Sequence, residues 1–171
     1  TDRIELMQVH NLSDWRTQLK TLREWKEKGT FRYIGLTHYT TSAHDDLIAV
    51  ARREKIDFLQ FPYSIDLRAA ERRLLPFARD NGIATIANVP FGQGGLFRQV
   101  RGKTPPGWAA EFGADSWARF FLKYVLGDPA LTCVIPGTGK VHHARDNVGA
   151  GFGRLPTTAE RRKMVETIAD L

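Results

Sequence analysis

Cysteine is almost absent from this sequence. The 171 residues contain one cysteine, Cys133, so no disulfide bond can form within the chain. Cys133 lies in a short apolar stretch, where a free thiol behaves as a small packing residue. We therefore expect Cys133 to be buried, and we expect a protein of a reducing compartment such as the cytoplasm.

Long hydrophobic runs are also missing. No apolar run approaches the roughly 18 residues that a membrane-spanning helix needs, so we expect no membrane span. With 42% hydrophobic and 26% charged residues, the composition is that of a globular protein, and it excludes disordered and fibrous classes. We expect residues 1–171 to form a single domain.

The positive charge does not have the pattern of a nucleic-acid-binding protein. The net charge is +6, but Lys and Arg alternate with acidic residues, as at positions 52–55 and 160–163. Aromatic residues that could stack on bases do not alternate with them. A small phosphorylated molecule is the better partner for a modest positive field.

Apolar segments rich in β-branched residues alternate with amphipathic segments along the chain. The expected strands begin near residues 4, 31, 56, 83 and 131, so the first three intervals are about 27, 25 and 27 residues. Each interval fits a strand, a helix and two loops. The alternation indicates an α/β fold with a parallel sheet covered by helices.

Two architectures fit this alternation, a doubly wound open sheet and a (β/α)₈ TIM barrel. The even spacing, without a Gly-x-Gly-x-x-Gly turn after the first strand, favours the barrel. Five units do not close a barrel of eight strands. We expect that three N-terminal units are missing from this chain; alternatively, the strand at residues 4–10 pairs with another chain.

Local signals predict where several helices begin and end. Ser42 is expected to cap the second helix, and Pro76 is expected to kink a helix over residues 69–79. Ser116 should begin a further helix, and residues 157–171 should form a capped C-terminal helix. The glycine- and proline-bearing stretch 90–115 is a candidate functional loop.

Polar residues stand at the C-terminal end of every expected strand. In a parallel sheet these ends share one rim, where barrel enzymes carry their sites. The last strand runs into Pro136-Gly137 and then into a helix start, an arrangement that attracts phosphate, although a simple turn has the same sequence pattern. The rim residues are His10, Thr37, His38, Gln60, Asn88, Gly137 and Thr138.

In order along the chain, these segments resemble the aldo/keto reductase family. The resemblance lies in residues 7–10, 34–39, Gln60 with 62–64, 89–92, and 134–138 followed by His143, Asp146 and Asn147. It implies a (β/α)₈ barrel that transfers hydride from NADPH to a small aldehyde or ketone. This chain looks like the fourth to eighth units of that barrel.

The resemblance assigns roles at the nicotinamide end of the cofactor. It makes His10 the catalytic histidine that orients the substrate carbonyl by a hydrogen bond. Thr37 and His38 stand where the family has Ser-Asn, and with Gln60 they would hold the carboxamide. Asn88 stands where many members have a tyrosine stacked on the nicotinamide.

The remaining assignments concern the phosphates and the adenosine. Backbone groups of Phe91 and Gln93 would contact the pyrophosphate. Gly137 and Thr138 would flank the 2′-phosphate, and His143 occupies the usual arginine position there. Asp146 and Asn147 would contact the adenine or its ribose. No metal is implied.

The family's proton-donating Tyr, with its Lys and Asp, has no counterpart in this sequence. We therefore expect the 171-residue chain alone to be inactive. Two other classes remain open: a noncatalytic nucleotide-binding or regulatory subunit, and a barrel lyase or aldolase that uses no nicotinamide.

Overall fold

The computed structural model describes residues 3–171 and contains five strands alternating with helices. The chain divides into two compact units, which are described separately below: Thr1–Pro62 with Ala69–Ile86, and Tyr63–Arg68 with Ala87–Leu171. The strand order is that of the sequence, and β4 runs from the first unit into the second. The strands are β1 Ile4–His10, β2 Phe31–Thr37, β3 Phe58–Pro62, β4 Ala84–Asn88 and β5 Cys133–Val134. The expected α/β fold is confirmed.

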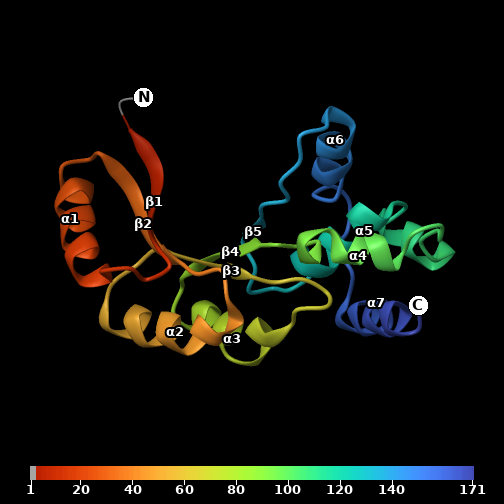
Figure 1. The fold of residues 1–171 in the computed structure, drawn as a ribbon, viewed down its shortest axis with the longest axis horizontal. Helices are drawn as coiled ribbons and strands as arrows, with labels where there is room; N and C mark the ends of the chain where they lie inside the picture. The colour runs from red at the N-terminus through yellow and green to blue at the C-terminus, as the bar shows by residue number, and fades with distance from the viewer. Residues whose placement is uncertain (1–2) are drawn as a thin grey trace. The chain divides into compact units, whose positions relative to one another are not determined.

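Helices follow the strands in both units (Figure 1). The first unit holds α1 Trp15–Glu27, the 3₁₀ turns η1 Thr41–Ala43 and η2 Ala69–Arg72, α2 His44–Arg53 and α3 Leu74–Asp80. The second unit holds η3 Gly92–Gly94, α4 Gly95–Gln99, η4 Gly107–Phe112, α5 Trp117–Leu126, α6 Val141–Gly149 and α7 Thr158–Ala169. Across residues 3–171, none of the helices combines the length and apolar character that crossing a membrane requires.

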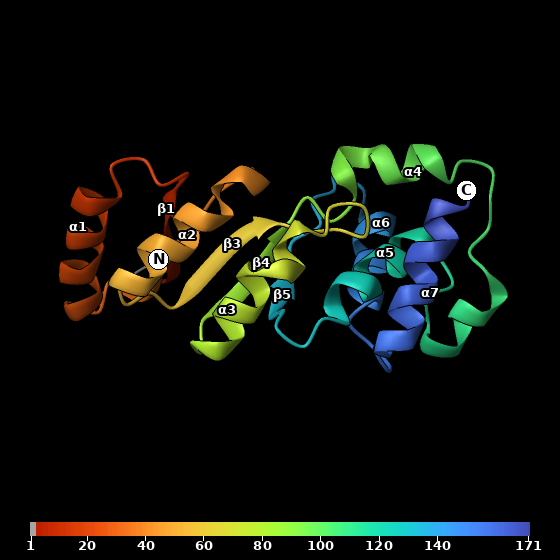
Figure 2. The same cartoon turned by 90° about the horizontal axis from the view of Figure 1, so that it is seen from below.

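The first unit is built on a parallel ladder of β1, β2 and β3. Helix α1 lies along β1 and β2, and α2 lies along β2 and beside α3 (Figures 1 and 2). Val9, Leu36 and Leu59 are aligned in register and fully buried. Because side chains alternate between the faces of a strand, the residue after each of these points to the opposite face. The core row therefore fixes which residues reach the other side of the sheet.

The second unit has its core under α5. Phe120, Phe121 and Val125 on this helix are fully buried. They belong to a run of six consecutive buried residues, 120–125, as in a helix that is surrounded by other parts of the protein. Helix α7 is fastened to α5 by Arg161, whose Nε donates to the carbonyl of Tyr124. The expected capping of the C-terminal helix is present: the Thr157 hydroxyl accepts from the Glu160 backbone N–H, and the Glu160 carboxylate accepts from Thr157 N.

Two of the local predictions were wrong. Ser42 does not cap α2, because η1 precedes the helix and the Ser42 hydroxyl is hydrogen-bonded to Thr40 instead. The chain breaks at Arg73, where φ is −140°, and not at Pro76. Pro76 is the third residue of α3, where the missing N–H would have had no partner within the helix.

The last strand is shorter than the expected 131–135. Only Cys133 and Val134 are extended as a strand, although Ile135 N still donates to the carbonyl of Ala87. Cys133 was expected to be buried, but it is only half-buried. This partial burial raises the pKa of the thiol. The short strand leaves Ile135 about half exposed at the start of the glycine-bearing turn.

Candidate functional site

Three predicted site residues lie in one row across the sheet, at the C-terminal ends of β1 and β2 and in the middle of β3. His10 is the register partner of Thr37, and Thr37 is the partner of Gln60. They face away from the core row, because each directly follows one of its members. His38 continues this end of the sheet, since its backbone N–H donates to the carbonyl of Gln60. The first unit thus brings together four of the five residues that were predicted for the nicotinamide end, whereas Asn88 belongs to the second unit.

Gln8, which the sequence analysis did not name as a site residue, orients the side-chain amide of Gln60. Gln8 Nε2 donates to Gln60 Oε1 at 2.8 Å, and the Gln60 NH₂ group is left to donate elsewhere. Gly35 is in β2, between β1 with Gln8 and β3 with Gln60, and a Cβ atom at Gly35 would be 3.1 Å from Gln8 Oε1. The absent side chain gives the Gln8 amide room. The signal was present in the sequence, because Gln8 is two residues before His10 and so shares its face of the strand.

His38 is held in one ring orientation. Its Nδ1 accepts from the Thr40 backbone N–H at 3.1 Å, and its ring stacks on Tyr39 with centroids 5.4 Å apart. In the neutral ring an accepting Nδ1 leaves the proton on Nε2. Nε2 is therefore the atom with which His38 can donate to a ligand.

Strained backbone follows two of the predicted strand ends. Non-glycine residues in the left-handed region cost on the order of 1–3 kcal/mol each and cluster at functional sites. After His10 the chain has such residues in a short turn, and after Asn88 it has two more. They are Asn11, Leu12 and Asp14 (φ 54°, 55° and 41°), and Val89 and Gln93 (φ 54° and 53°).

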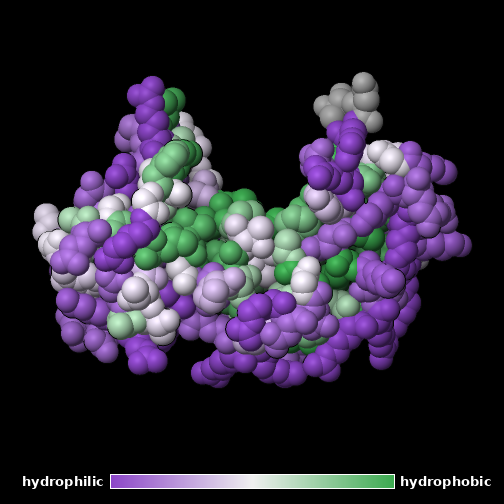
Figure 3. Space-filling model, turned by 180° about the vertical axis from the view of Figure 1, so that it is seen from behind, coloured by the Kyte–Doolittle hydropathy of each residue, from purple (hydrophilic) through white to green (hydrophobic). Residues whose placement is uncertain are grey.

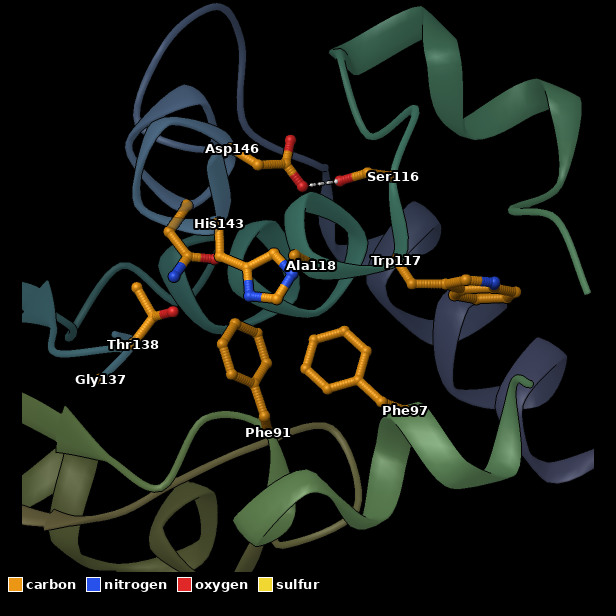
Figure 4. A pocket seen from close by; sticks show the side chains of 10 residues that line it. Phe91, Phe97, Ser116, Trp117, Ala118, Gly137, Thr138, His143 and Asp146 are labelled. Atoms are coloured by element: carbon orange, nitrogen blue, oxygen red, sulfur yellow. Dashed lines mark hydrogen bonds between the residues drawn. The ribbon is translucent and has the colours of Figure 1, made fainter. Parts of the chain in front are cut away.

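The second unit contains a cavity of about 500 Å³ that collects six predicted residues (Figure 4). It is lined by Phe91, Gly137, Thr138, His143, Asp146 and Asn147, and also by four residues that were not predicted, Phe97, Ser116, Trp117 and Ala118. Asn88 and Gln93 are not among the lining residues. The sequence analysis predicted only that a helix begins at Ser116; in the structure Ser116 caps α5, because its Oγ accepts from Arg119 N.

The cavity offers flat rings on one side and open backbone on the other. The rings of Phe91 and Phe97 are 4.8 Å apart, and in Figure 4 they lie below the imidazole of His143. A Cβ atom at Gly137 would have nothing within 4 Å, so a ligand can approach this backbone. Thr138 Oγ1 accepts from the backbone N–H of Lys140 and so orders the turn. Such a cavity suits a planar base with a phosphate group beside it.

The carboxylate of Asp146 is already engaged by α5. Oδ2 accepts from Ser116 Oγ at 2.6 Å, the interaction dashed in Figure 4. Oδ1 lies 2.8 Å from Arg119 Nε. That N–H makes no hydrogen bond within the described chain, so the contact is an ion pair. Asp146 therefore ties α6 to α5, a role that its predicted contact with adenine or ribose did not include.

Comparison with known proteins gives the family. The model of the aldo/keto reductase family matches residues 1–169. Pyridoxine 4-dehydrogenase of Escherichia coli is 32% identical over 133 residues, which are 77% of this chain and 43% of that protein. The NADH-specific methylglyoxal reductase of the same organism is 35% identical over 88 residues, 52% of this chain and 26% of that protein. The chain spans about half the length of the curated relatives it matches.

Solved structures agree in fold. The thermostable aldo-keto reductase Tm1743, in complex with epalrestat, has a TM-score of 0.73 and 25% identity over 98% of this chain and 61% of its own. An aldo-keto reductase from Klebsiella pneumoniae in complex with NADPH has a TM-score of 0.76 at 17% identity and covers 98% of this chain and 60% of its own. The parallel strands with alternating helices are thus those of a (β/α)₈ barrel fold. With a family match over nearly its whole length and this fold, the chain belongs to the aldo/keto reductase family.

Proposed function

We propose that the protein carrying this chain reduces a small aldehyde or ketone to an alcohol with NADP(H). The observation that carries the proposal is the in-register row of His10, Thr37 and Gln60 on one face of the first unit. NADPH, when bound, supplies the hydride. The row supplies a histidine to orient a carbonyl, and hydroxyl and amide groups to hold a carboxamide.

The residues present fit the two ends of the cofactor. At the nicotinamide end Gln60 has its Oε1 fixed by Gln8 and its NH₂ free to donate to a carboxamide oxygen. At the adenosine end the second unit's cavity supplies aromatic rings and the open backbone at Gly137. In the proposal Thr138 and His143 lie by the 2′-phosphate, and Asn147 lies by the adenine or ribose. Asp146 contributes mainly by its tie to α5.

Proton donation is assigned to residues outside this chain. Reducing a carbonyl develops negative charge on oxygen, and a positioned general acid contributes about 10²- to 10⁴-fold. Tyr63 and Tyr124 are buried, and the Tyr63 hydroxyl accepts from Arg161, so neither fits the donor. We propose that this chain corresponds to the fourth to eighth units of a cytoplasmic barrel enzyme and is inactive alone.

Cofactor binding is the first test. Isothermal titration of the full-length protein should detect NADPH binding, and Thr138→Glu should weaken NADPH more than NADH, because a carboxylate repels the 2′-phosphate. Equal losses for both cofactors would remove Thr138 from that role. If NADPH does not bind to the full-length protein at all, the cofactor proposal is wrong.

Turnover is the second test. His10→Ala should lower the rate of 4-nitrobenzaldehyde reduction by about 10²- to 10³-fold, the usual cost of one positioned donor, with little change in NADPH affinity. A lower melting temperature with normal turnover would make His10 structural. NADPH binding without any turnover by the full-length protein would favour the alternative of a noncatalytic nucleotide-binding subunit.

A further inference from the structure

Helix α6 has very little apolar anchoring. None of its nine residues, Val141–Gly149, is buried, and Val141 and Val148 are 70% and 64% exposed. In Figure 3 the surface of this helix, at the upper left, is mostly polar. Helices shorter than about 12–15 residues are marginal alone and depend on packing an apolar face. Something other than apolar burial must hold α6 in place.

Polar contacts to α5 take that role. Asp146, in the second half of α6, accepts from Ser116 and pairs with Arg119. Arg119 is itself held, because its Nη1 donates to Asp115 at 3.0 Å. The next residues of α5, Phe120 and Phe121, are fully buried, so α5 is a fixed support for this ion pair.

Gly149 leaves room for the guanidinium of Arg119, because it has no side chain. A Cβ atom at Gly149 would lie 2.7 Å from Arg119 Nε and Nη2 and 2.8 Å from Cζ. These atoms are the far end of a flexible side chain, so a methyl group there would displace Arg119 from Asp146 while leaving the backbone in place. The glycine at the end of α6 thus lets Arg119 lie across the helix and reach the carboxylate.

We propose that Arg119 is a positioning residue, which through Asp146 fixes α6 and thereby places His143 and Asn147 at the cavity. Residues three and four positions apart share one face of a helix, so rotation or fraying of α6 carries these two side chains away from a ligand together. For its effect on NADPH this inference rests on the proposed function. The anchoring of α6 itself requires no cofactor.

The anchoring is tested first without cofactor, in the full-length protein, by hydrogen exchange of the α6 amides. Arg119→Gln and Gly149→Ala should each lower protection of residues 144–149 by about 10-fold, the effect of losing roughly 1.4 kcal/mol. Arg162→Gln, an exposed arginine on α7, and Gly151→Ala, where the nearest atom to a new Cβ is at 3.4 Å, are the matched controls and should leave α6 unchanged. Protection that stays at the wild-type level in both test variants overturns the proposal.

The second measurement is cofactor affinity and turnover. Arg119→Gln and Gly149→Ala should raise the Kd for NADPH by about 10-fold. They should also raise the KM for NADPH with kcat nearly unchanged. Arg119→Lys should recover part of the lost affinity. The double variant Arg119→Gln with Asp146→Asn should be no worse than Arg119→Gln alone, because both remove one interaction. Additive losses, or a fall in kcat alone, would overturn the positioning role. If the wild-type protein binds no NADPH, the proposed function fails, and the exchange experiment still decides the anchoring.

Discussion

Replacing Gly35 by alanine should destabilise the first unit, because a new Cβ atom there would collide with the neighbouring strand. Gly35 lies in β2, the central strand of the β1–β2–β3 ladder. An added Cβ atom would be 2.7 Å from Phe58 O and 2.9 Å from Phe58 Cβ. The first of these atoms is backbone, so it cannot rotate away.

The magnitude follows from that geometry. A distance of 2.7 Å falls about 0.7 Å short of ordinary contact at 3.4 Å, and strands in a sheet are held about 4.8 Å apart by their hydrogen bonds. Overpacking costs typically 1–3 kcal/mol, and here β2 must also move away from β3. We expect a loss of about 3 kcal/mol, the upper end of that range. For a protein of this size that is roughly 6–12 °C in melting temperature.

Thermal unfolding of the Gly35→Ala protein, followed by circular dichroism, measures this loss. Gly107→Ala is the control, because a Cβ there would meet nothing within 4 Å, and its melting temperature should stay near the wild-type value. The new methyl group would also press on Gln8, which orients Gln60. NADPH affinity should therefore decrease, because Gln60 is proposed to hold the carboxamide. A Gly35→Ala protein that melts within about 1 °C of the control, equivalent to less than roughly 0.5 kcal/mol, would refute the close packing argued for β2.

Three further changes test other parts of the chain. Burial lowers the pKa of His44, whose Nε2 has no hydrogen-bond partner within the described chain. The unfolded histidine, with a pKa of about 6.5, binds protons more readily than the folded one. The free energy of unfolding should therefore stay constant above that pH and decrease below it. His44→Gln should flatten this decline in urea titrations at pH 7 and 5. Thr157→Ala removes the hydroxyl that caps α7 and should cost about 1 kcal/mol by urea unfolding, whereas Thr158→Ala, one residue further, should not. Val89→Asn should raise the melting temperature by about 2–4 °C, since Val89 has a φ of 54° that asparagine tolerates better than a β-branched residue; an unchanged value would mean that this turn stores no strain.

Much of the fold could be predicted because its signals are local. The apolar run from Ile4 ends at His10 in both the prediction and the structure, and the cap at Thr157 begins the last helix as expected. Ser42 and Pro76 were misjudged because a short polar residue or a proline has several possible local roles. Which role is realised depends on where the preceding turn, η1 or η2, places the residue.

The sequence by itself determined the alternation of strands and helices and the polar ends of the strands, because periodicity and turn residues act over a few neighbouring positions. It also carried the family resemblance, through the order of short motifs. Only the tertiary structure decided that Gln8 reaches Gln60 across Gly35, and that Arg119 lies on Gly149 and pairs with Asp146. These contacts join residues from 27 to 52 positions apart in sequence, and the packing of strand on strand and helix on helix selects them, which no local pattern encodes.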